Sequence, residues 1–375
     1  MSSRSVAHLV IGGGPAGSMA AIRLAEAGRP VTLIERERAE HHKVCGEFLS
    51  QEAVGYLHRA GVSPMALGAV PISRVRLSAG RHSAGAALPF QALSLSRRVL
   101  DAALLQRAAD LGCEVIRGVG IERLTADGSM WTAQRSDDEI LHAQTVFLAS
   151  GKHDLHGWSR DKGAQSNMVG FKMHWRLAPR QTQELRDWME LFLFRGGYGG
   201  IALVEDETAN LCLVMQRQEL RRVGTWQALL AAITDENQRL RTLLQDAEGL
   251  WPRPLAISPI PYGYLATQPC GLWRVGDQAV VIPSFTGNGM SIAMHSAHLA
   301  TQMYLAGENT DAYYRALRAQ LRNSVALATR ISQAMVNAMG RKFAVPAVSL
   351  IPGAMRWIAA STRIPAAALR FDAAV

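Results

Sequence analysis

Three glycines near the start of the chain constrain the fold most strongly. Gly12, Gly14 and Gly17 have the spacing G-x-G-x-x-G, and they lie between a short apolar run and a stretch with helical spacing. A second apolar run follows and ends at Glu35. A strand, a glycine turn, a helix and a second strand in this order predict a unit that binds a dinucleotide.

Each residue type in this turn has a physical reason. Gly12 permits a tight turn, Gly14 lets the backbone approach a pyrophosphate, and Gly17 lets the helix pack closely against the strand. Pro15 and Ala16 complete the turn before the helix, whose free N–H groups and partial positive charge favour phosphate. We therefore expect these five residues to bind the cofactor.

An acidic residue completes the pattern. Glu35 lies 18 residues beyond Gly17, where a carboxylate accepts hydrogen bonds from a ribose and disfavours a 2′-phosphate. Arg36 follows it directly, and we predict that it belongs to the same site.

Two later segments select the dinucleotide. The first is L-S-R-R-V-L-D, which contains Arg97, and the second is GDQAVVIPSFTGNGM, which contains Asp277. At these residues the chain resembles the flavoprotein superfamily of the aromatic-ring hydroxylases (the p-hydroxybenzoate hydroxylase type), the flavin-dependent halogenases and the geranylgeranyl reductases. The resemblance implies that the cofactor is FAD.

The resemblance also implies roles for single residues. Asp277 would bind the ribityl chain of the flavin, and Arg97 would lie near the FAD phosphates. The glycine-rich segment that follows Asp277 would lie against the isoalloxazine ring with Pro283, Gly287, Asn288, Gly289 and Met290. The residues agree with this, because a helix that opens at 287–291 offers backbone donors to the flavin edge that gains negative charge on reduction.

We predict an α/β fold, in which a Rossmann-type FAD-binding domain carries an inserted mixed β-sheet substrate domain and a C-terminal helical segment. The FAD-binding domain is expected at 1–74, 95–164 and 265–330, the substrate domain at 75–94 and 165–264, and a helical cap at 331–375. The cap is predicted to break at Pro346, Pro352 and Pro365, and it is apolar with scattered basic residues. It could be a simple cap, a surface for peripheral membrane contact, or a wall for an apolar substrate.

Composition excludes several classes of protein. Apolar residues make up 48% and charged residues 19%, which supports a large core. The net charge is +9, but the sequence has no block of five or six basic residues, so we expect no nucleic-acid partner. The four cysteines show no C-x-x-C spacing, and we predict no metal site. No signal peptide or apolar stretch of about 20 residues is recognised, so we expect a cytoplasmic protein; the oligomeric state is not predicted.

Three residues are candidates for catalysis. Cys45 and Glu47 lie in K-V-C-G-E-F-L-S, which resembles the C-G-x-x-L-S segment of geranylgeranyl reductases beside the flavin. Cys45 is interpreted as a proton donor or as a small buried residue, and Glu47 as a group that orients substrate or bonds to its own loop. Tyr198, in G-G-Y-G-G, is expected either to touch the substrate or only to pack.

Two other polar groups have less specific patterns. Lys172, His174 and Arg176 would share one face of a strand, which could be solvent-exposed or line an anionic end of the substrate pocket. His153, Asp154 and His156 could form a metal site or an acid–base pair, but they are interpreted as polar residues of a surface loop, because adjacent side chains point apart and no third metal ligand is evident.

The predicted function is an FAD-dependent oxidoreductase that acts on a hydrophobic or aromatic small molecule, polyketide- or isoprenoid-like. Monooxygenation is placed first, because it is widespread in the superfamily. Reduction of a carbon–carbon double bond is second, because of the Cys45 segment. Halogenation and a non-catalytic flavoprotein rank lower. NAD(P)H is expected as a transient electron donor, because the sequence shows no separate nicotinamide-binding fold.

Overall fold

The computed structural model of the protein describes residues 3–128, 130–267, 271–351 and 353–369. Its first β-sheet contains β1 (Ser3–Ile11), β2 (Val31–Glu35), β6 (Glu114–Arg117), β7 (Ile121–Asp127), β8 (Met130–Arg135), β9 (Ile140–Leu148) and β17 (Trp273–Arg274). The order is β6-β2-β1-β9-β8-β7, and β17 pairs with β9. The strands β6, β2, β1, β9 and β17 pair in parallel, whereas β7, β8 and β9 are antiparallel.

The central strand of this sheet is buried on both faces, which explains its continuous apolar sequence. Val10 joins the core on the side of α1 (Pro15–Glu26), α3 (Arg97–Asp110) and α8 (Gly289–Leu305). Its neighbours Leu9 and Ile11 point the other way, into a core formed with β7 to β9. The carboxyl ends of β1 and β2 therefore meet beside the start of α1, which is where open parallel sheets bind ligands.

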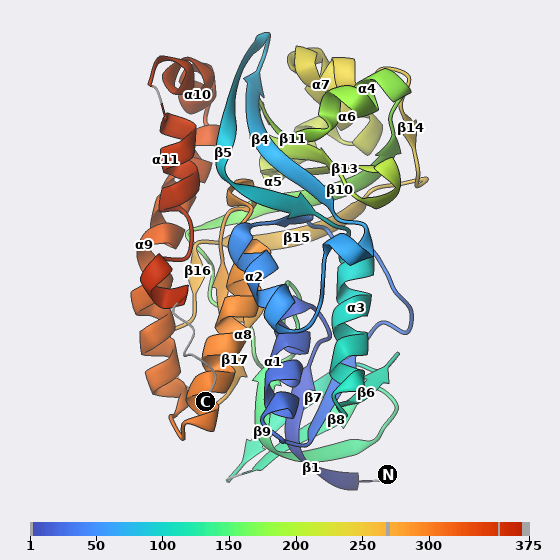
Figure 1. The fold of residues 1–375 in the computed structure, drawn as a ribbon, viewed down its shortest axis with the longest axis vertical. Helices are drawn as coiled ribbons and strands as arrows, with labels where there is room; N and C mark the ends of the chain where they lie inside the picture. The colour runs from blue at the N-terminus through green and yellow to red at the C-terminus, as the bar shows by residue number, and fades with distance from the viewer. Residues whose placement is uncertain (1–2, 129, 268–270, 352, 370–375) are drawn as a thin grey trace.

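The second sheet lies above the first in Figure 1. It contains β3 (Phe48–Leu49), β4 (Val70–Ala79), β5 (His82–Ser94), β10 (Gln165–Arg176), β11 (Asp187–Phe194), β12 (Gly197–Leu203), β13 (Ala209–Gln216), β14 (Glu248–Gly249) and β15 (Leu255–Tyr262). The order is β14-β10-β13-β12-β11-β4-β5-β3, and β15 also pairs with β10. Because β4 and β11 are parallel and the other pairs antiparallel, the sheet is mixed, and the predicted fold class is confirmed.

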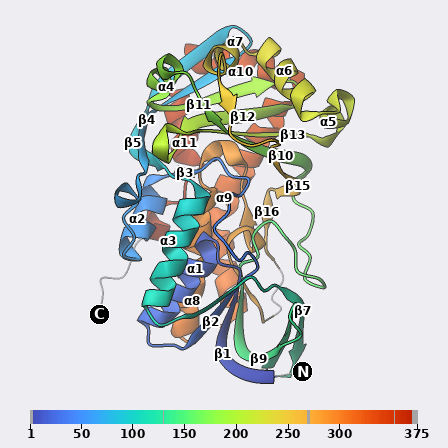
Figure 2. The same cartoon turned by 90° about the vertical axis from the view of Figure 1, so that its right-hand side faces the viewer.

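The outer face of the second sheet is covered by α4 (Pro179–Leu185), α5 (Arg217–Val223), α6 (Trp226–Glu236) and α7 (Gln238–Leu243), as Figures 1 and 2 show. Leu229 and Ile233 of α6 are buried in this core. The inner face is turned toward the first sheet. The remaining short elements are α2 (Gln51–Arg59), β16 (Tyr264–Leu265), β18 (Val280–Val281) and the 3₁₀ turns Met65–Leu67, Glu205–Glu207, Gly276–Gln278, Ser284–Thr286 and Ala366–Leu369.

Three C-terminal helices form one flank of the molecule (Figure 1): α9 (Thr310–Val336), α10 (Ala338–Leu350) and α11 (Ala354–Ser361). The predicted break at Pro346 is wrong, because α10 continues through it. Pro346 lacks the N–H that would bond to the carbonyl of Lys342, and Lys342 lies at an exposed position of the helix. Pro352 and residues 370–375 lie outside the described residues, whereas Pro365 does follow the end of α11.

The chain crosses between the two sheets several times. It enters the second sheet at β3 to β5, returns for α3 and β6 to β9, leaves again for β10 to β15, and comes back at β17. The predicted domain boundaries themselves stay a prediction. The loops that connect the sheets line the space between them, and this is where the candidate site lies.

Candidate active site

One large cavity runs between the two sheets, with a volume of about 910 Å³. Of the predicted cofactor residues it is lined by Gly12, Gly14, Pro15, Ala16, Glu35, Arg36, Arg97, Asp277, Gly287, Asn288, Gly289 and Met290. Cys45, Glu47 and Tyr198 line it as well. The predicted residues that do not line it are Gly17 and Pro283, although their neighbours Ala16 and Ser284 do.

The glycine turn has the geometry that its sequence predicts. Gly12 has φ +106°, and a Cβ there would lie 2.4 Å from the carbonyl oxygen of Ala149. A Cβ on Gly17 would lie 1.8 Å from the carbonyl oxygen of Gly12. Gly14 borders the cavity and is the N-cap of α1, and no side chain caps it. The first N–H groups of α1 therefore face the cavity and are available to an anion.

The turn gives a direct test. Gly17→Ala should abolish FAD binding and lower the free energy of unfolding by several kcal/mol, because its Cβ would overlap a backbone oxygen of the turn. Gly55→Ala is the matched control: Gly55 lies in α2, and a Cβ there meets nothing within 4 Å. That control should gain roughly 0.5–1 kcal/mol. Flavin absorbance and urea denaturation measure both, and a stable, yellow Gly17→Ala protein would contradict the assignment.

Glu35 supports the turn from below. Its Oε2 accepts a hydrogen bond from the N–H of Gly13 at 2.7 Å, and its Oε1 accepts one from the N–H of Glu37 at 3.0 Å. The side chain is buried but still lines the cavity. It therefore fixes the glycine turn as well as presenting a carboxylate to a ribose. Arg36 is exposed at the edge of the cavity and pairs with Glu37.

Two cations lie beside Gly14. Arg97 binds both carboxylate oxygens of Asp101, with its Nε at 2.7 Å and its Nη2 at 2.8 Å. Nζ of Lys43 lies 3.1 Å from the same carboxylate. A Cβ on Gly14 would lie 3.2 Å from Nη2 of Arg97 and 4.0 Å from Nζ of Lys43. Two positive charges share one negative charge, so the excess favours an anionic group above the glycine turn. Lys43 was not among the predicted site residues.

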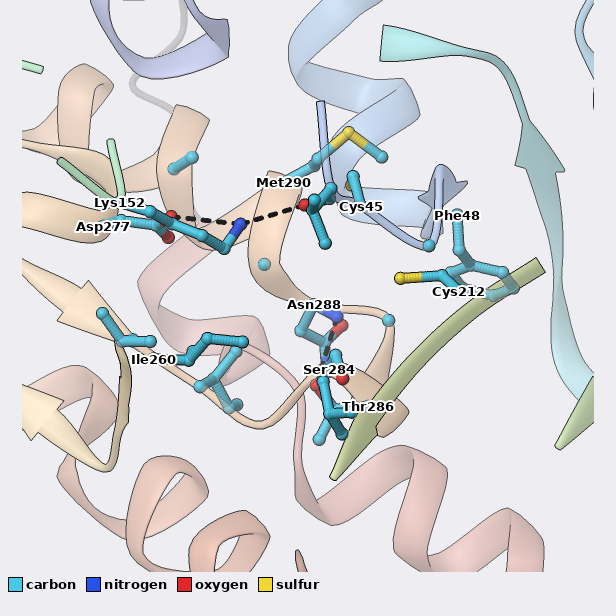
Figure 3. Close-up of a pocket in the computed structure, with 18 of the residues that line it drawn as sticks. Cys45, Phe48, Lys152, Cys212, Ile260, Asp277, Ser284, Thr286, Asn288 and Met290 are labelled. Carbon is cyan, nitrogen blue, oxygen red and sulfur yellow. Dashed lines mark hydrogen bonds and ion pairs between the residues drawn. The ribbon is translucent and has the colours of Figure 1, made fainter. Parts of the chain in front are cut away.

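The second motif forms the opposite wall. Asp277 points its carboxylate into the cavity, and Nζ of Lys152 lies 3.6 Å from it (Figure 3). Gly287 has φ +68° and packs against Phe48, whereas a Cβ on Gly289 would meet nothing within 4 Å. The N-terminus of α8 thus opens onto free space.

The start of α8 has no side-chain cap, because Asn288 instead donates from Nδ2 to the carbonyl oxygen of Thr362 at 2.9 Å. Met290 lines the cavity in the first turn of this helix. Pro283 begins the turn before α8, and its carbonyl accepts the hydroxyl of Thr286 at 2.9 Å. Its role is to shape the turn.

These residues fit FAD. A pyrophosphate suits Gly14 with Arg97 and Lys43, a ribose suits Glu35, and a ribityl chain suits Asp277. The uncapped N-terminus of α8 supplies the donors that a flavin edge needs.

The segment around Cys45 is held by hydrogen bonds from two other parts of the chain, and Figure 3 shows its position in the cavity. Lys152 donates from Nζ to the carbonyl oxygen of Val44 at 3.2 Å, and Asn210 donates from Nδ2 to the carbonyl oxygen of Cys45 at 3.1 Å. The Sγ of Cys45 accepts the N–H of Glu47 at 3.4 Å. The thiol therefore has a fixed position in the cavity wall.

Glu47 is completely buried, and its carboxylate is used inside the protein. It bonds to Nζ of Lys172, to Nε2 of His174 at 3.2 Å and to the N–H of Arg97 at 2.7 Å. Burial alone would raise the pKa of Glu47, but His174 and Lys172 outweigh it and hold the pKa below its ordinary value. Glu47 thus stays ionised and anchors the Cys45 segment to β10.

Lys172 and His174 were predicted either to face solvent or to line the substrate pocket. Both predictions are wrong, since the two side chains are buried beside Glu47 and neither lines the cavity. Arg176, at the end of the strand, is exposed. Ligand atoms of His42, Glu47 and His174 lie within 4.8 Å of one another, close enough to share an ion. Because the Lys172 ammonium already neutralises Glu47, we assign an ion pair rather than a metal site.

Tyr198 lies on β12 with its ring in the cavity wall and only 2% of its surface exposed. Its hydroxyl accepts a hydrogen bond from Oγ of Ser332 on α9 at 3.3 Å, and burial raises the pKa of Tyr198. The ring meets Phe285 edge-on. In this structure the hydroxyl ties the second sheet to α9.

The part of the cavity beyond the cofactor residues is apolar. The second sheet contributes Leu77, Leu88, Phe90, Leu191 and Val214, and the C-terminal helices contribute Met335, Ala344, Val348, Met355 and Ile358. Cys212, on β13, also lines it, and burial raises the pKa of its thiol to about 12. A compartment of this kind accepts an apolar molecule and excludes water.

The loop after β9 is polar, as predicted. Asp154 pairs with Arg160 at 2.6 Å, and His153 is exposed. Arg160 also donates to the carbonyl oxygen of Asp277 at 2.9 Å, so the loop supports the second FAD motif.

Comparisons with known proteins agree with this site. Residues 5–175 match the family described as FAD binding domain. The chain is 25% identical, over 83% of its length and 79% of the relative's, to the probable electron transfer flavoprotein-quinone oxidoreductase YdiS of Escherichia coli. It is 24% identical to a menaquinone reductase of Mycolicibacterium smegmatis, over 81% of this chain and 77% of that one.

Among solved structures, the chain is similar to PqsL, a probable FAD-dependent monooxygenase from Pseudomonas aeruginosa. The TM-score is 0.72 at 16% identity, over 92% of this chain and 100% of that one. Halogenase structures share this fold as well. In sequence and fold the chain is therefore similar to FAD-dependent reductases and to an FAD-dependent monooxygenase. It is an FAD-dependent oxidoreductase.

Proposed function

We propose that this oxidoreductase reduces a carbon–carbon double bond in a long apolar, isoprenoid-like molecule. The observation that carries the proposal is the position of Cys45 in the cavity wall, close to Met290 of the second FAD motif (Figure 3). The names of the relatives YdiS and menaquinone reductase both refer to quinones, which supports a substrate with an isoprenoid-like, apolar part.

Reduced FAD, when bound, supplies the hydride for such a reaction. The protein has to supply the proton for the other carbon, and the Cys45 S–H is suited to this because its segment is held by Lys152, Asn210 and Glu47. The apolar walls exclude water, so the proton comes from a fixed group. Addition of the hydride and the proton saturates the double bond, and the thiolate is reprotonated from solvent before the next turnover.

Cys45→Ser tests this role. A hydroxyl is a much weaker acid than a thiol, so we expect the rate of double-bond reduction to fall by about 10²–10⁴-fold with FAD binding unchanged. Cys212→Ser is the matched control, because Cys212 is the other thiol of the cavity wall among the described residues and should retain most of the activity. Stopped-flow reoxidation of the reduced flavin, without oxygen, by a polyprenyl compound that carries no quinone ring measures both, and the product should contain two more hydrogen atoms than the substrate. Unchanged turnover in Cys45→Ser would remove Cys45 from the reaction.

Monooxygenation, which the sequence placed first, is the second candidate. The water-excluding compartment beside the FAD residues favours it, because oxygen transfer from a reduced flavin also needs a dry site. Turnover under ¹⁸O₂ separates the two. One labelled oxygen atom in the product would establish a monooxygenase, whereas saturation of the double bond without oxygen would establish a reductase.

We further propose NAD(P)H as a transient electron donor. The cations Arg36, Lys43 and Lys152 line the cavity and would attract its phosphates. Anaerobic mixing of the yellow protein with NADH or NADPH tests this, since either donor should bleach the flavin absorbance. A flavin that stays oxidised with both, but is reduced by a reduced protein carrier, would contradict the proposal.

A further inference from the structure

Large exposed apolar side chains gather on one flank of the molecule. Six are found in the described residues, and five of them lie on α10, on α11 or between the two: Met339, Phe343, Leu350, Ile351 and Trp357. We call these five side chains the apolar flank. Leu350 is 80% and Trp357 59% exposed, whereas the sixth residue, Met65, lies elsewhere. A cluster of this kind marks an interaction surface.

The same part of the chain carries the whole net charge. Residues 312–371 contain nine of the 40 Lys and Arg residues and none of the 31 Asp and Glu residues. The rest of the chain thus has 31 of each and is neutral, against +9 for the whole chain. Lys342 and Arg356 adjoin the apolar flank, are exposed, and form no ion pair with any described residue. The flank therefore combines apolar side chains with unneutralised positive charge.

The geometry suits a helix pair that lies along a surface. Figure 1 places α9, α10 and α11 together at one side of the molecule, and α10 and α11 meet at 109°. Among the described residues, no single helix is long and apolar enough to cross a bilayer, and α10 with α11 qualifies only as a bent pair. At 1.5 Å per residue, α10 is about 20 Å and α11 about 12 Å long. Each is shorter than the roughly 30 Å hydrocarbon core.

The substrate compartment reaches this flank. Ala344, Val348, Met355 and Ile358 form its wall from the inner sides of α10 and α11. Phe343 lines the cavity and is also 52% exposed, and Ala347 is likewise both a lining and an exposed residue. The cavity therefore opens where the apolar side chains are exposed.

We propose that the apolar flank inserts into the surface of an anionic lipid bilayer. The apolar side chains enter the interface, Lys342 and Arg356 contact the negative head groups, and the cavity opens toward the lipid. An apolar substrate then passes from the bilayer to the compartment without crossing water. This last step rests on the proposed function, whereas the docking itself does not.

Vesicle flotation of the FAD-loaded protein tests the docking. We expect binding to phosphatidylcholine vesicles that contain about 30% phosphatidylglycerol, and much weaker binding to phosphatidylcholine alone. Lys342→Gln/Arg356→Gln should weaken binding roughly 25-fold, since each basic side chain near a charged membrane contributes about fivefold. Leu350→Ser/Trp357→Ser should weaken it at least about tenfold, because two large apolar side chains no longer leave water.

Two matched controls lie away from the flank. Met65→Ser removes the sixth exposed apolar side chain, and Arg29→Gln removes an exposed basic one near the first sheet. Both should bind vesicles as the wild type does.

Equal binding of all variants, or no binding to anionic vesicles, would overturn the proposal. So would a dimer without vesicles that Leu350→Ser/Trp357→Ser converts to a monomer, because a second copy would then cover the flank. Flavin reoxidation by a detergent-solubilised polyprenyl compound that carries no quinone ring is measured in parallel, so that loss of docking and loss of reductase activity are distinguished.

Discussion

Glu47→Gln is expected to lower the free energy of unfolding by about 3–5 kcal/mol, as is usual when one partner of a buried ion pair is removed. Glu47 and Lys172 are both completely buried and form an ion pair. The amide has nearly the same shape as the carboxylate, so the effect arises from the Lys172 ammonium, which would remain in the interior without an anion. Urea denaturation followed by tryptophan fluorescence measures the change.

The control for this prediction removes both charges. Glu47→Gln/Lys172→Met should regain most of the lost stability, because no unpaired charge then remains. The same cycle tests the anchoring role: the single variant should also bind FAD more weakly, since the neutral amide oxygen accepts the N–H of Arg97 less strongly than the carboxylate does. If the single variant unfolds within about 1 kcal/mol of the wild type, the buried pair is not the anchor that we infer.

The ionisation of Glu47 should also contribute to the pH dependence of the free energy of unfolding. The pKa of Glu47 lies below its ordinary value of 4.5 in the folded protein, held there by His174 and Lys172 against the effect of burial. Its contribution is therefore fully present above about pH 4.5, and it is lost as the pH falls through the lower, folded value. The Glu47→Gln protein should lack this component of acid unfolding, and identical acid profiles would contradict the assignment.

Asp277→Ala should yield colourless protein, with FAD affinity reduced by roughly 10–100-fold, the usual contribution of hydrogen bonds to a charged group. Asp277 is the carboxylate of the second FAD motif, it lines the cavity, and its loss would leave Lys152 without its anion. Asp161→Ala, at an exposed carboxylate in the loop region before β10, is the matched control and should stay yellow. The ratio of flavin to protein absorbance after purification decides, and a fully loaded Asp277→Ala protein would end the assignment.

The glycine turn and Glu35 could be predicted from the sequence because these residues are close together in the chain. The spacing of Gly12, Gly14 and Gly17 is a local property of one turn, and Glu35 follows at the end of the next strand. Lys43 and Lys152 line the same cavity from loops 109 residues apart, and no local sequence pattern indicates that they belong to the site. They were missed for that reason.

The buried face of β10 shows a different limit. Alternation predicted that Lys172 and His174 share one side of the strand, and they do. What that side faces depends on Glu47, which is more than 120 residues away and enters the interior only because the Cys45 segment is folded under the sheet. A lysine and a histidine spaced by two residues give no sign of a partner so distant in sequence.

The repeated crossing of the chain between the two sheets has a consequence for synthesis on the ribosome. The central strand β1 needs β9, whose last residue is Leu148, and β9 in turn pairs with β17, which ends at Arg274. At a typical 5–20 residues per second, roughly 13–55 s separate the emergence of the first and last of these strands. During that interval the part of β9 that pairs with β17 lacks its partner, so the first sheet is not completed as an independent cotranslational unit. We expect nascent chains of this protein to bind chaperones until β17 has left the exit tunnel.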